Sequence, residues 1–346
     1  MKLGLTLGYW GAQPPTDALE KILEAERLGY DAVFTAESWG SDAFGPLAWW
    51  GSQTSRIRLG TSIVQISART PTSCAMHALT LDHLSGGRLV LGLGVSGPQV
   101  VEGWYGRPFG KPLARTREYV DVIRQVLRRE GPVTSEGPHH PLPFHGEGAI
   151  GRGKALRPIT HPRRADLPIW LGAEGPKNVA LAGEICDGWL PIYYSPKVSG
   201  MYQGWLDEGF ARRPDADTAA ATYEIAPNCS VVVTDDVDAA LDAMRPTLGF
   251  YIGGMGAKDM NFHKQVFARM GYEREAETIQ DLFLDGKRDD AIAAVPAQMA
   301  ADISLVGSVE KIRDDLQAWE DAGVTMLVVG ATSLDQLRQT AEVILG

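Results

Sequence analysis

The 346-residue chain has little of what marks secreted, membrane or metal-binding proteins. Its three cysteines, Cys74, Cys186 and Cys229, lie far apart and form no CxxC pair. A disulfide framework or a zinc site is therefore not expected, and a reducing compartment fits best. No stretch of roughly 18 residues is apolar throughout, so no membrane span is expected. The N-terminus also lacks the basic region, apolar run and cleavage site of a signal peptide. We therefore expect a cytoplasmic protein.

Basic charge is scarce as well. The chain has 33 Lys and Arg residues against 43 Asp and Glu residues, which gives a formal net charge of −10. Because an acidic surface repels nucleic acid and anionic membranes, neither is expected as a partner, and a small-molecule substrate is expected instead. With 44% hydrophobic residues, the chain has enough apolar material for a sizeable core.

Short apolar segments alternate with amphipathic helical segments along the whole chain. The run Arg88–Gly94 (RLVLGLG) is almost continuously apolar, which is typical of a parallel strand covered on both faces. Eight strand–helix units without a linker predict one α/β domain over residues 1–346, a (β/α)8 TIM barrel. The expected strands are residues 3–8, 31–37, 58–66, 88–94, 168–173, 187–192, 228–234 and 324–330.

Two long segments interrupt the strand–helix pattern. An ordinary barrel needs about 250 residues, so roughly a hundred must lie in insertions. Residues 131–166 are rich in Pro, Gly and His, and residues 235–306 have a mostly helical pattern. Long connections in compact domains often form lids or binding loops. We therefore expect both insertions near the mouth of the barrel.

Two glycine-rich segments follow expected strands. Gly92–Gly97 (GLGVSG) satisfies GxGxxG, but Gly103 and Gly106 break the helix that a dinucleotide fold requires. We interpret it as a strand end where a flat ring or a ribityl-like chain approaches the backbone. Leu171–Pro176 (LGAEGP) places two glycines before a proline in a first helical turn. The free N–H groups and the helix dipole favour an anion there, although a plain strand–helix turn has the same pattern.

Glu37 and Ser38 follow the second expected strand, at the end of the barrel where catalytic residues of this fold lie. The Glu37 carboxylate could accept a hydrogen bond from a ring N–H or a hydroxyl, or hold a proton in a relay. The alternative is a structural ion pair with a nearby arginine.

Aromatic and histidine side chains complete the set of candidates. The histidines His139, His140 and His145 lack an acidic or cysteine partner at ligand spacing, so no metal site is expected. Five aromatic residues follow two of the expected strands. They could wall a planar ligand, although ordinary packing at the barrel rim would have the same pattern: Tyr9, Trp10, Trp189, Tyr193 and Tyr194.

Several longer motifs point to a known family. They are LGTSI (59–63), LDHLSGGR (81–88) leading into LGLG (91–94), IWLGAEGP (169–176), AGEICDG (182–188), AIAAV (291–295), VGS (306–308) and AGV (322–324). Over nearly its whole length the chain resembles the bacterial-luciferase-like superfamily, in the branch that uses the deazaflavin coenzyme F420. It is most similar to methylenetetrahydromethanopterin reductases and mycobacterial luciferase-like oxidoreductases.

The resemblance implies an activity, a cofactor and an assembly. It implies a hydride transfer between coenzyme F420 and an organic substrate, with an FMN-dependent monooxygenase as the alternative, and a homodimer or higher homo-oligomer. It implies a bulge with a non-proline cis peptide, Ser62–Ile63, behind the deazaflavin ring. It also implies that the cofactor's middle contacts Val95, Ser96 and Gly97, and that its phosphate binds at Gly172, Ala173, Glu174, Gly175 and Pro176.

One feature departs from the family pattern. Members that oxidise alcohols or sugar phosphates have an Asp-His or similar pair after the second strand, and the histidine acts as the base. Here the pair is Glu37-Ser38. Because a serine hydroxyl cannot take a proton from an alcohol at neutral pH, a reductase or an enzyme with an activated substrate is favoured. A basic stretch at 152–157 could meet the coenzyme's acidic tail, or form a solvated loop.

Overall fold

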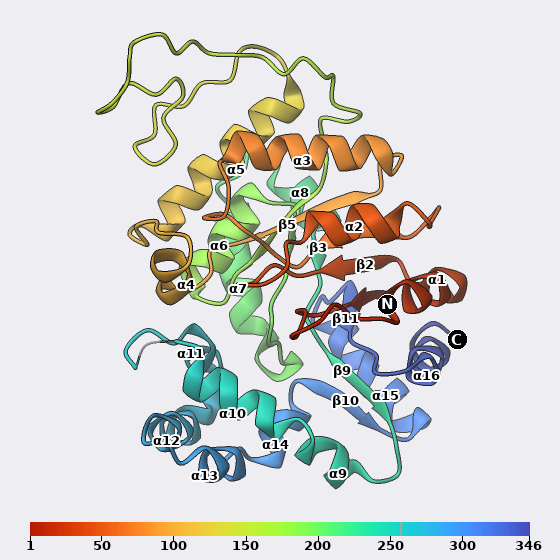
Figure 1. The fold of residues 1–346 in the computed structure, drawn as a ribbon. Helices are drawn as coiled ribbons and strands as arrows, with labels where there is room; N and C mark the ends of the chain where they lie inside the picture. The colour runs from red at the N-terminus through yellow and green to blue at the C-terminus, as the bar shows by residue number, and fades with distance from the viewer. Residues whose placement is uncertain (257) are drawn as a thin grey trace.

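The computed structural model describes residues 1–256 and 258–346. Parallel strands follow one another in the order β11-β1-β2-β3-β5-β6-β7-β8, with helices on the outside (Figure 1). This is the predicted (β/α)8 architecture, which is confirmed. The strands of the barrel are β1 (Lys2–Thr6), β2 (Ala32–Thr35), β3 (Arg58–Thr61), β4 (Val64–Gln65), β5 (Leu89–Gly94), β6 (Ile169–Gly172), β7 (Gly188–Trp189), β8 (Glu224–Ile225) and β11 (Met326–Val329).

The closing strand differs from the expectation. β8 pairs with β7, and the residues after β8 reach β11, because the Val328 N–H donates to the Pro227 carbonyl over 2.8 Å and the Cys229 N–H to the Val328 carbonyl over 2.9 Å. The expected strand 228–234 was therefore placed too late in the chain. Only β9 (Ser230–Val233) forms within it, and it pairs with β10 (Ser304–Gly307) in a separate two-stranded sheet. Pro227 has no N–H to donate, so it interrupts the ladder between the two parts.

The helices of the barrel follow the apolar periodicity. Gly29, with φ 92°, ends α1 as expected, and the Ser308 hydroxyl caps α15 by accepting from the Lys311 N–H over 3.3 Å. None of the helices in the described part of the chain is long and apolar enough to cross a membrane. The helices are α1 (Ala18–Leu28), α2 (Phe44–Gly51), α3 (Pro71–Leu84), α4 (Pro98–Gly103), α5 (Pro112–Arg128), α6 (Pro176–Ile185), η1 (Pro196–Val198), α7 (Ser199–Phe210), α8 (Ala216–Thr222), α15 (Val309–Asp321) and α16 (Leu334–Leu345).

Large side chains fill the inside of the barrel. Phe34 on β2 and Trp170 on β6 lie with ring centroids 5.9 Å apart, and both are almost fully buried. A Cβ on Gly60 would come within 2.3 Å of the Phe34 ring, so glycine is needed there to admit the ring. The barrel is therefore a packed core, and a ligand can bind only at one of its ends.

Strand three contains a one-residue bulge. Gly60 pairs with Val90, whereas Val64 pairs with Leu93, so four steps along strand three match three steps along β5. The Thr61 hydroxyl fills the gap in the ladder, donating to the Gly92 carbonyl over 2.8 Å and accepting from the Gly92 N–H over 2.9 Å. The Ser62–Ile63 peptide is cis. The bulge and the cis peptide that the family resemblance implied are both present.

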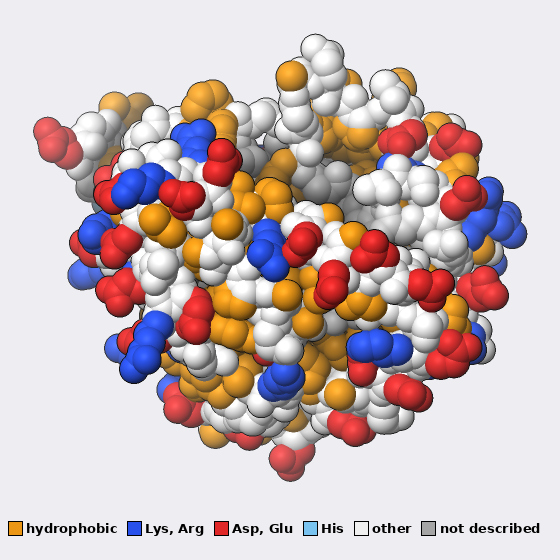
Figure 2. Space-filling model, turned by 90° about the horizontal axis from the view of Figure 1, so that it is seen from below, with side chains coloured by type: hydrophobic (Ala, Val, Ile, Leu, Met, Phe, Trp, Pro, Cys, Tyr) orange, Lys and Arg blue, Asp and Glu red, His pale blue; other side chains and the backbone are white. Residues whose placement is uncertain are grey.

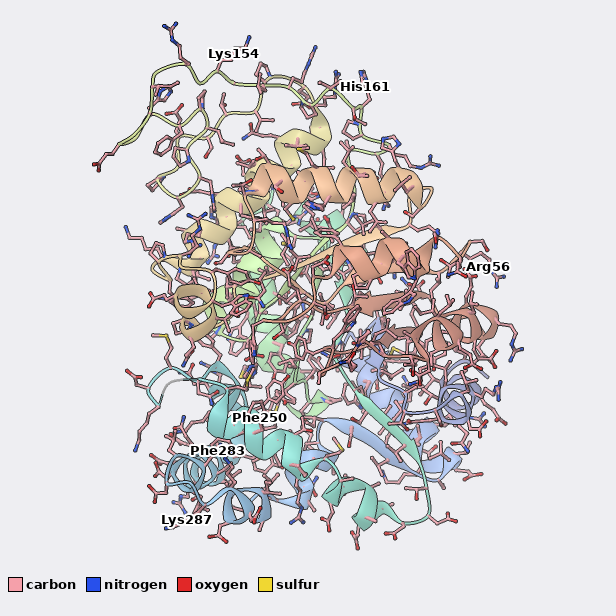
Figure 3. The ribbon with its side chains drawn as sticks, viewed as in Figure 1. Arg56, Lys154, His161, Phe250, Phe283 and Lys287 are labelled. Atoms are coloured by element: carbon pink, nitrogen blue, oxygen red, sulfur yellow. The ribbon has the colours of Figure 1, made fainter. Side chains whose placement is uncertain are left out.

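The insertion between β9 and β10 forms a helical cap with an apolar core of its own. Phe250 on α10 and Phe283 on α12 face one another, with centroids 6.2 Å apart (Figure 3). Seen from below, the surface of the molecule shows acidic and basic side chains dispersed among apolar ones (Figure 2). The cap consists of α9 (Val237–Asp242), α10 (Arg245–Gly254), α11 (Phe262–Phe267), the π-helical turn η2 (Ala268–Tyr272), α12 (Glu273–Leu284), α13 (Arg288–Ala293) and α14 (Ala297–Ala301).

The connection between α5 and β6 lies elsewhere than expected. Its His139 and His140 N–H groups donate to Glu118 on α5, over 2.9 and 3.0 Å, and His83 on α3 contacts the His161 carbonyl over 2.8 Å. It therefore packs outside α3 and α5, on the side away from the helical cap, and Lys154 lies at its outer edge (Figures 1 and 3). The expected place at the barrel mouth is wrong for residues 131–166. An αβ connection enters its strand from the amino end, opposite the mouth.

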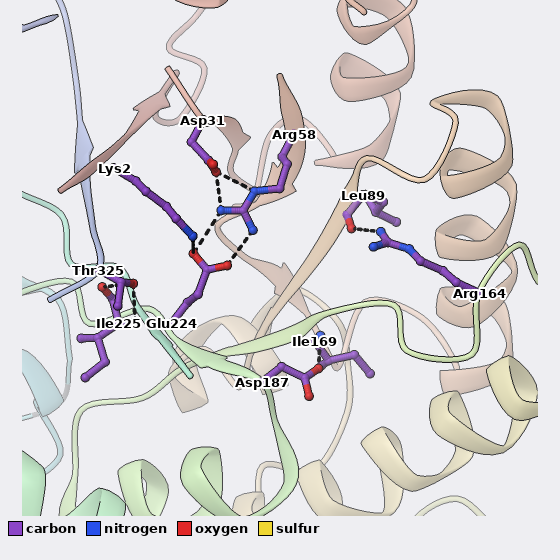
Figure 4. A network of polar contacts seen from close by, with 10 residues as sticks. All are labelled: Lys2, Asp31, Arg58, Leu89, Arg164, Ile169, Asp187, Glu224, Ile225 and Thr325. Carbon is purple, nitrogen blue, oxygen red and sulfur yellow. Dashed lines mark hydrogen bonds and ion pairs between the residues drawn. The ribbon is translucent and has the colours of Figure 1, made fainter. Parts of the chain in front are cut away.

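An ion network joins the amino ends of four barrel strands (Figure 4). Arg58 donates to both carboxylate oxygens of Glu224, over 2.8 and 3.1 Å, and to Asp31 over 2.6 Å. Lys2 donates to Glu224 over 3.1 Å. The Arg58 guanidinium also lies 5.4 Å from the centre of the Trp170 ring. The network ties β1, β2, β3 and β8 together at the end opposite the mouth.

This network predicts a loss of stability in acid. Burial raises the pKa of Glu224, but the hydrogen bonds and charge of Arg58 and the charge of Lys2 outweigh burial, so its pKa is lowered from 4.5 overall. A carboxylate with a lowered folded pKa stabilises the protein fully above its unfolded pKa, and this contribution is lost as the pH falls through the folded value. Glu224→Gln should therefore lower the free energy of unfolding at pH 7 and flatten its decline below about pH 4.5.

Urea unfolding at pH 7 and at pH 4 measures both effects. The exposed Glu208→Gln variant is the control and should leave both values close to those of the unmodified protein. Equal declines in the Glu224→Gln variant and the unmodified protein would contradict the assignment.

Candidate functional site

The bulge of strand three lies against the carboxyl ends of β5 and β6. A Cβ on Gly94 would come 2.8 Å from Ile63 Cδ1, and a Cβ on Gly172 would come 3.2 Å from Ile63 Cγ2. A Cβ at Gly94 would clash with the Ile63 side chain, and one at Gly172 would crowd it. Ile63, Gly94 and Gly172 thus form one contact at the mouth of the barrel, and two sequence-predicted segments are brought together there.

The turn from β6 into α6 presents unpaired backbone donors. Asn178 and Val179 donate to the Gly175 carbonyl over 3.0 and 2.9 Å, and Pro176 has no N–H. The N–H groups of Glu174, Gly175 and Lys177 find no acceptor among the described residues. Free N–H groups at the positive end of a ten-residue helix make a binding place for an anion. A Cβ on Gly175 would meet nothing within 4 Å, so the space in front of the turn is open.

The turn after β5 has a similar form. Ser96 has a left-handed φ of 61°, and Gly97 precedes the short helix α4. Val100 and Val101 donate to the Gly97 carbonyl over 3.1 and 3.0 Å. The helix already ends at Gly103. The interpretation of GLGVSG as a strand end, in preference to a dinucleotide fingerprint, is therefore confirmed by the barrel and by this short helix.

Glu37 lies after β2 with both carboxylate oxygens occupied. One oxygen accepts from the Gln65 N–H over 2.8 Å and from Arg69 over 3.1 Å, and the other accepts from Arg69. The side chain is only 3% exposed. The structure thus contains the ion pair with an arginine that the sequence left open as the alternative. Ser38, next to it, is half-buried, and its hydroxyl has no hydrogen-bond partner among the described residues.

The helical cap adds residues that the sequence did not indicate. The Tyr251 ring on α10 and the Tyr193 ring after β7 lie 4.9 and 6.0 Å from the His263 ring on α11. His263 in turn lies 2.9 Å from the Glu174 carboxylate. Burial raises the pKa of Tyr193 well above its usual value, and the neighbouring Tyr251 and Glu174 raise it further. No sequence pattern could reveal these contacts, because they join the barrel to residues of an insertion.

A cavity of about 360 Å³ lies at the seam between barrel and cap. Strand ends of the barrel form one wall, and helix α10 with the two residues before it forms the other. Its size suits a small organic molecule. The lining includes Thr6, Tyr193, Asn228, Met244, Leu248 and Val328.

Comparisons with known proteins agree with this architecture. Residues 4–326 match the family described as luciferase-like monooxygenase. The chain is 61% identical over 344 residues, 99% of each chain, to a Mycobacterium tuberculosis protein provisionally named coenzyme F420-dependent oxidoreductase. It is 28% identical over 333 residues, 92% of this chain and 89% of the relative, to 5,10-methylenetetrahydromethanopterin reductase of Methanopyrus kandleri. The solved structure of the coenzyme F420 dependent tetrahydromethanopterin reductase from Methanopyrus kandleri has a TM-score of 0.79 at 24% identity, covering 99% of this chain and 98% of that one.

Proposed function

The chain belongs to the luciferase-like monooxygenase family. From its 61% identity to a protein provisionally named coenzyme F420-dependent oxidoreductase, we propose that it is a coenzyme F420-dependent oxidoreductase that acts as a reductase on an organic substrate. When bound, the coenzyme supplies and accepts the hydride. The observation that carries the proposal is the contact of Ile63 with Gly94 and Gly172, beside the free N–H groups of the β6–α6 turn. A flat wall and an anion-binding turn at one barrel mouth suit a planar cofactor with a phosphate.

The residues of the mouth fit this cofactor in three parts. Ser62 and Ile63 would back the ring, because the bulge places Ile63 across the ends of β5 and β6. The phosphate would be held by the free N–H groups of the turn after β6, which consists of Gly172, Ala173, Glu174, Gly175 and Pro176. The middle of the cofactor would contact the turn after β5, which consists of Val95, Ser96 and Gly97. Ser96 in this turn has a left-handed backbone conformation.

Glu37 and Ser38 have different roles in this proposal. The Ser38 hydroxyl would hydrogen-bond near the reacting ring or to the substrate. Glu37 has no free oxygen, so it acts as a positioning residue that holds the end of β2 to the segment carrying Gln65 and Arg69. The Ser38 hydroxyl cannot take a proton from an alcohol at neutral pH, and both oxygens of Glu37 accept hydrogen bonds from Gln65 and Arg69. This favours the direction of reduction.

An FMN-dependent monooxygenase is the second candidate, because the family description names monooxygenases. The two functions are separated by titrating the purified protein with coenzyme F420 and with reduced FMN, and by measuring oxygen uptake. We expect tighter binding of coenzyme F420 and no oxygen uptake. Tight binding of reduced FMN together with oxygen consumption would contradict the proposal.

Exposed apolar side chains on α2 and α3 are the basis for proposing a homodimer. Trp49 on α2 is 74% exposed, and Met76 and Leu84 on α3 are 66% and 77% exposed. We infer that these side chains belong to one interface, because a contiguous apolar patch on a protein surface usually marks one. We expect the protein to sediment as a dimer, and the Trp49→Glu/Leu84→Glu variant to sediment as a monomer. Ile150, which is 85% exposed in the α5–β6 connection, is the matched control, and Ile150→Glu should remain a dimer. A monomeric unmodified protein would contradict the proposal.

A further inference from the structure

Glu174 and His263 meet at the seam between barrel and cap. Glu174 belongs to the turn after β6, and His263 comes from α11. His263 Nδ1 lies 2.9 Å from Glu174 Oε1, with the two side chains 15% and 18% exposed. The pair therefore joins the turn proposed for the cofactor to the element that covers the mouth.

The pair has unused hydrogen-bonding capacity. Glu174 Oε2 is buried and has no hydrogen-bond partner among the described residues, and His263 Nδ1, although close to Oε1, is not aligned with an acceptor. A buried polar atom without a partner is unfavourable by about 1–3 kcal/mol. Such atoms are few in native proteins, and a catalytic role or a bound water or ion commonly explains them. Here they lie beside Tyr193, which also lines the cavity at the seam.

The remaining histidines lie on other elements. Of the seven in the chain, His77 and His83 are on α3, and the other four outside the cap are in the α5–β6 connection. The position after β2 holds Ser38, and both carboxylate oxygens of Glu37 accept hydrogen bonds from Gln65 or Arg69. The position after β2 therefore offers no imidazole, whereas α11 supplies one beside the turn after β6.

We propose that Glu174 and His263 form the proton-donating pair of this reductase, which acts on a carbonyl group; this rests on the proposed function. The hydride of the reduced deazaflavin adds to the carbonyl carbon, the C=O π bond breaks, and the oxygen takes a proton from the imidazolium of His263. The deazaflavin is oxidised, the carbonyl is reduced to an alcohol, and His263 regains its proton from solvent. Glu174 lies against Nδ1 and holds the imidazole in place.

The test compares unmodified protein, His263→Ala, Glu174→Gln and the control His145→Ala, which lies in the α5–β6 connection. Each is given reduced coenzyme F420 with cyclohexanone or with 4-oxocyclohexanecarboxylate, and the Kd for coenzyme F420 is measured separately. We expect His263→Ala to lower kcat for cyclohexanone by about 100-fold or more, to keep the Kd for the coenzyme, and to regain turnover when imidazole is added. Glu174→Gln should lower kcat for both ketones, because the imidazole loses the carboxylate that holds it in place.

Two failures are distinguishable. Absence of coenzyme F420 binding by the unmodified protein overturns the proposed function itself. Binding of the coenzyme, with no turnover of either ketone or with turnover that is unaffected in His263→Ala, overturns the role of the pair. A loss of kcat that imidazole does not restore also overturns it, because a purely structural histidine would behave in that way.

Discussion

Replacing Gly175 with valine is expected to weaken binding of coenzyme F420 by about 100-fold without loss of folding stability. Gly175 has φ −91° and ψ 155°, which any residue adopts, and a Cβ there meets no protein atom within 4 Å. The new side chain would instead occupy the space in front of the free N–H groups. Losing two charge-assisted hydrogen bonds of about 1.5 kcal/mol each corresponds to this 100-fold change.

Isothermal titration of the variant with coenzyme F420 measures the effect, and thermal unfolding checks the fold. Gly131, after α5, also has open space around its Cβ position, so Gly131→Val is the matched control and should bind normally. Unchanged affinity in Gly175→Val would remove the phosphate from this turn. The neighbouring Gly172 is a less clean target, because a Cβ there already approaches Ile63 at 3.2 Å.

Removing the partner of Glu37 is expected to be strongly destabilising. In Arg69→Met the Glu37 carboxylate would stay 3% exposed without its cation. Breaking a buried ion pair on one side typically lowers the free energy of unfolding by about 3–5 kcal/mol. Urea unfolding at pH 7 measures this loss.

The double variant Glu37→Gln/Arg69→Met separates charge from packing. It removes the buried negative charge as well, so it should regain part of the stability lost in Arg69→Met. A loss below about 1 kcal/mol in Arg69→Met would show that water reaches the pair, as at exposed ion pairs.

The fold was predictable where local pattern decides it. Three features were predicted from neighbouring residues and lie at the predicted positions. They are the buried strand β5, the glycine that ends α1 and the Ser308 cap of α15. The seventh strand was misplaced because Val231 and Val232 have strong strand character, while the barrel position belongs to Glu224 and Ile225. Pairing with β7 and β11 decides which segment enters the barrel, and the strand propensity of single residues carries no information about this pairing.

The site was predictable to a similar degree. The two glycine turns and the bulge follow from motifs, since a Cβ at Gly94 would clash with the Ile63 side chain and one at Gly172 would crowd it. The partners of Glu37 and Glu174 did not follow. Arg69 and His263 reach these carboxylates across space from other elements, and a single sequence carries no mark of such a contact. The first insertion was misplaced because length alone does not tell which end of the barrel a connection leaves from.

The helical cap has its own apolar core and leaves the barrel through β9 and returns through β10. The elements proposed to hold the coenzyme, in contrast, all belong to barrel strands and their turns. Specificity can therefore diverge, together with the proposed proton donor His263, by exchange of a self-packed unit, while the elements proposed to hold the coenzyme are inherited unchanged. A chimera that carries residues 235–306 of a paralogue should acquire the donor's range of substrates and keep its own coenzyme.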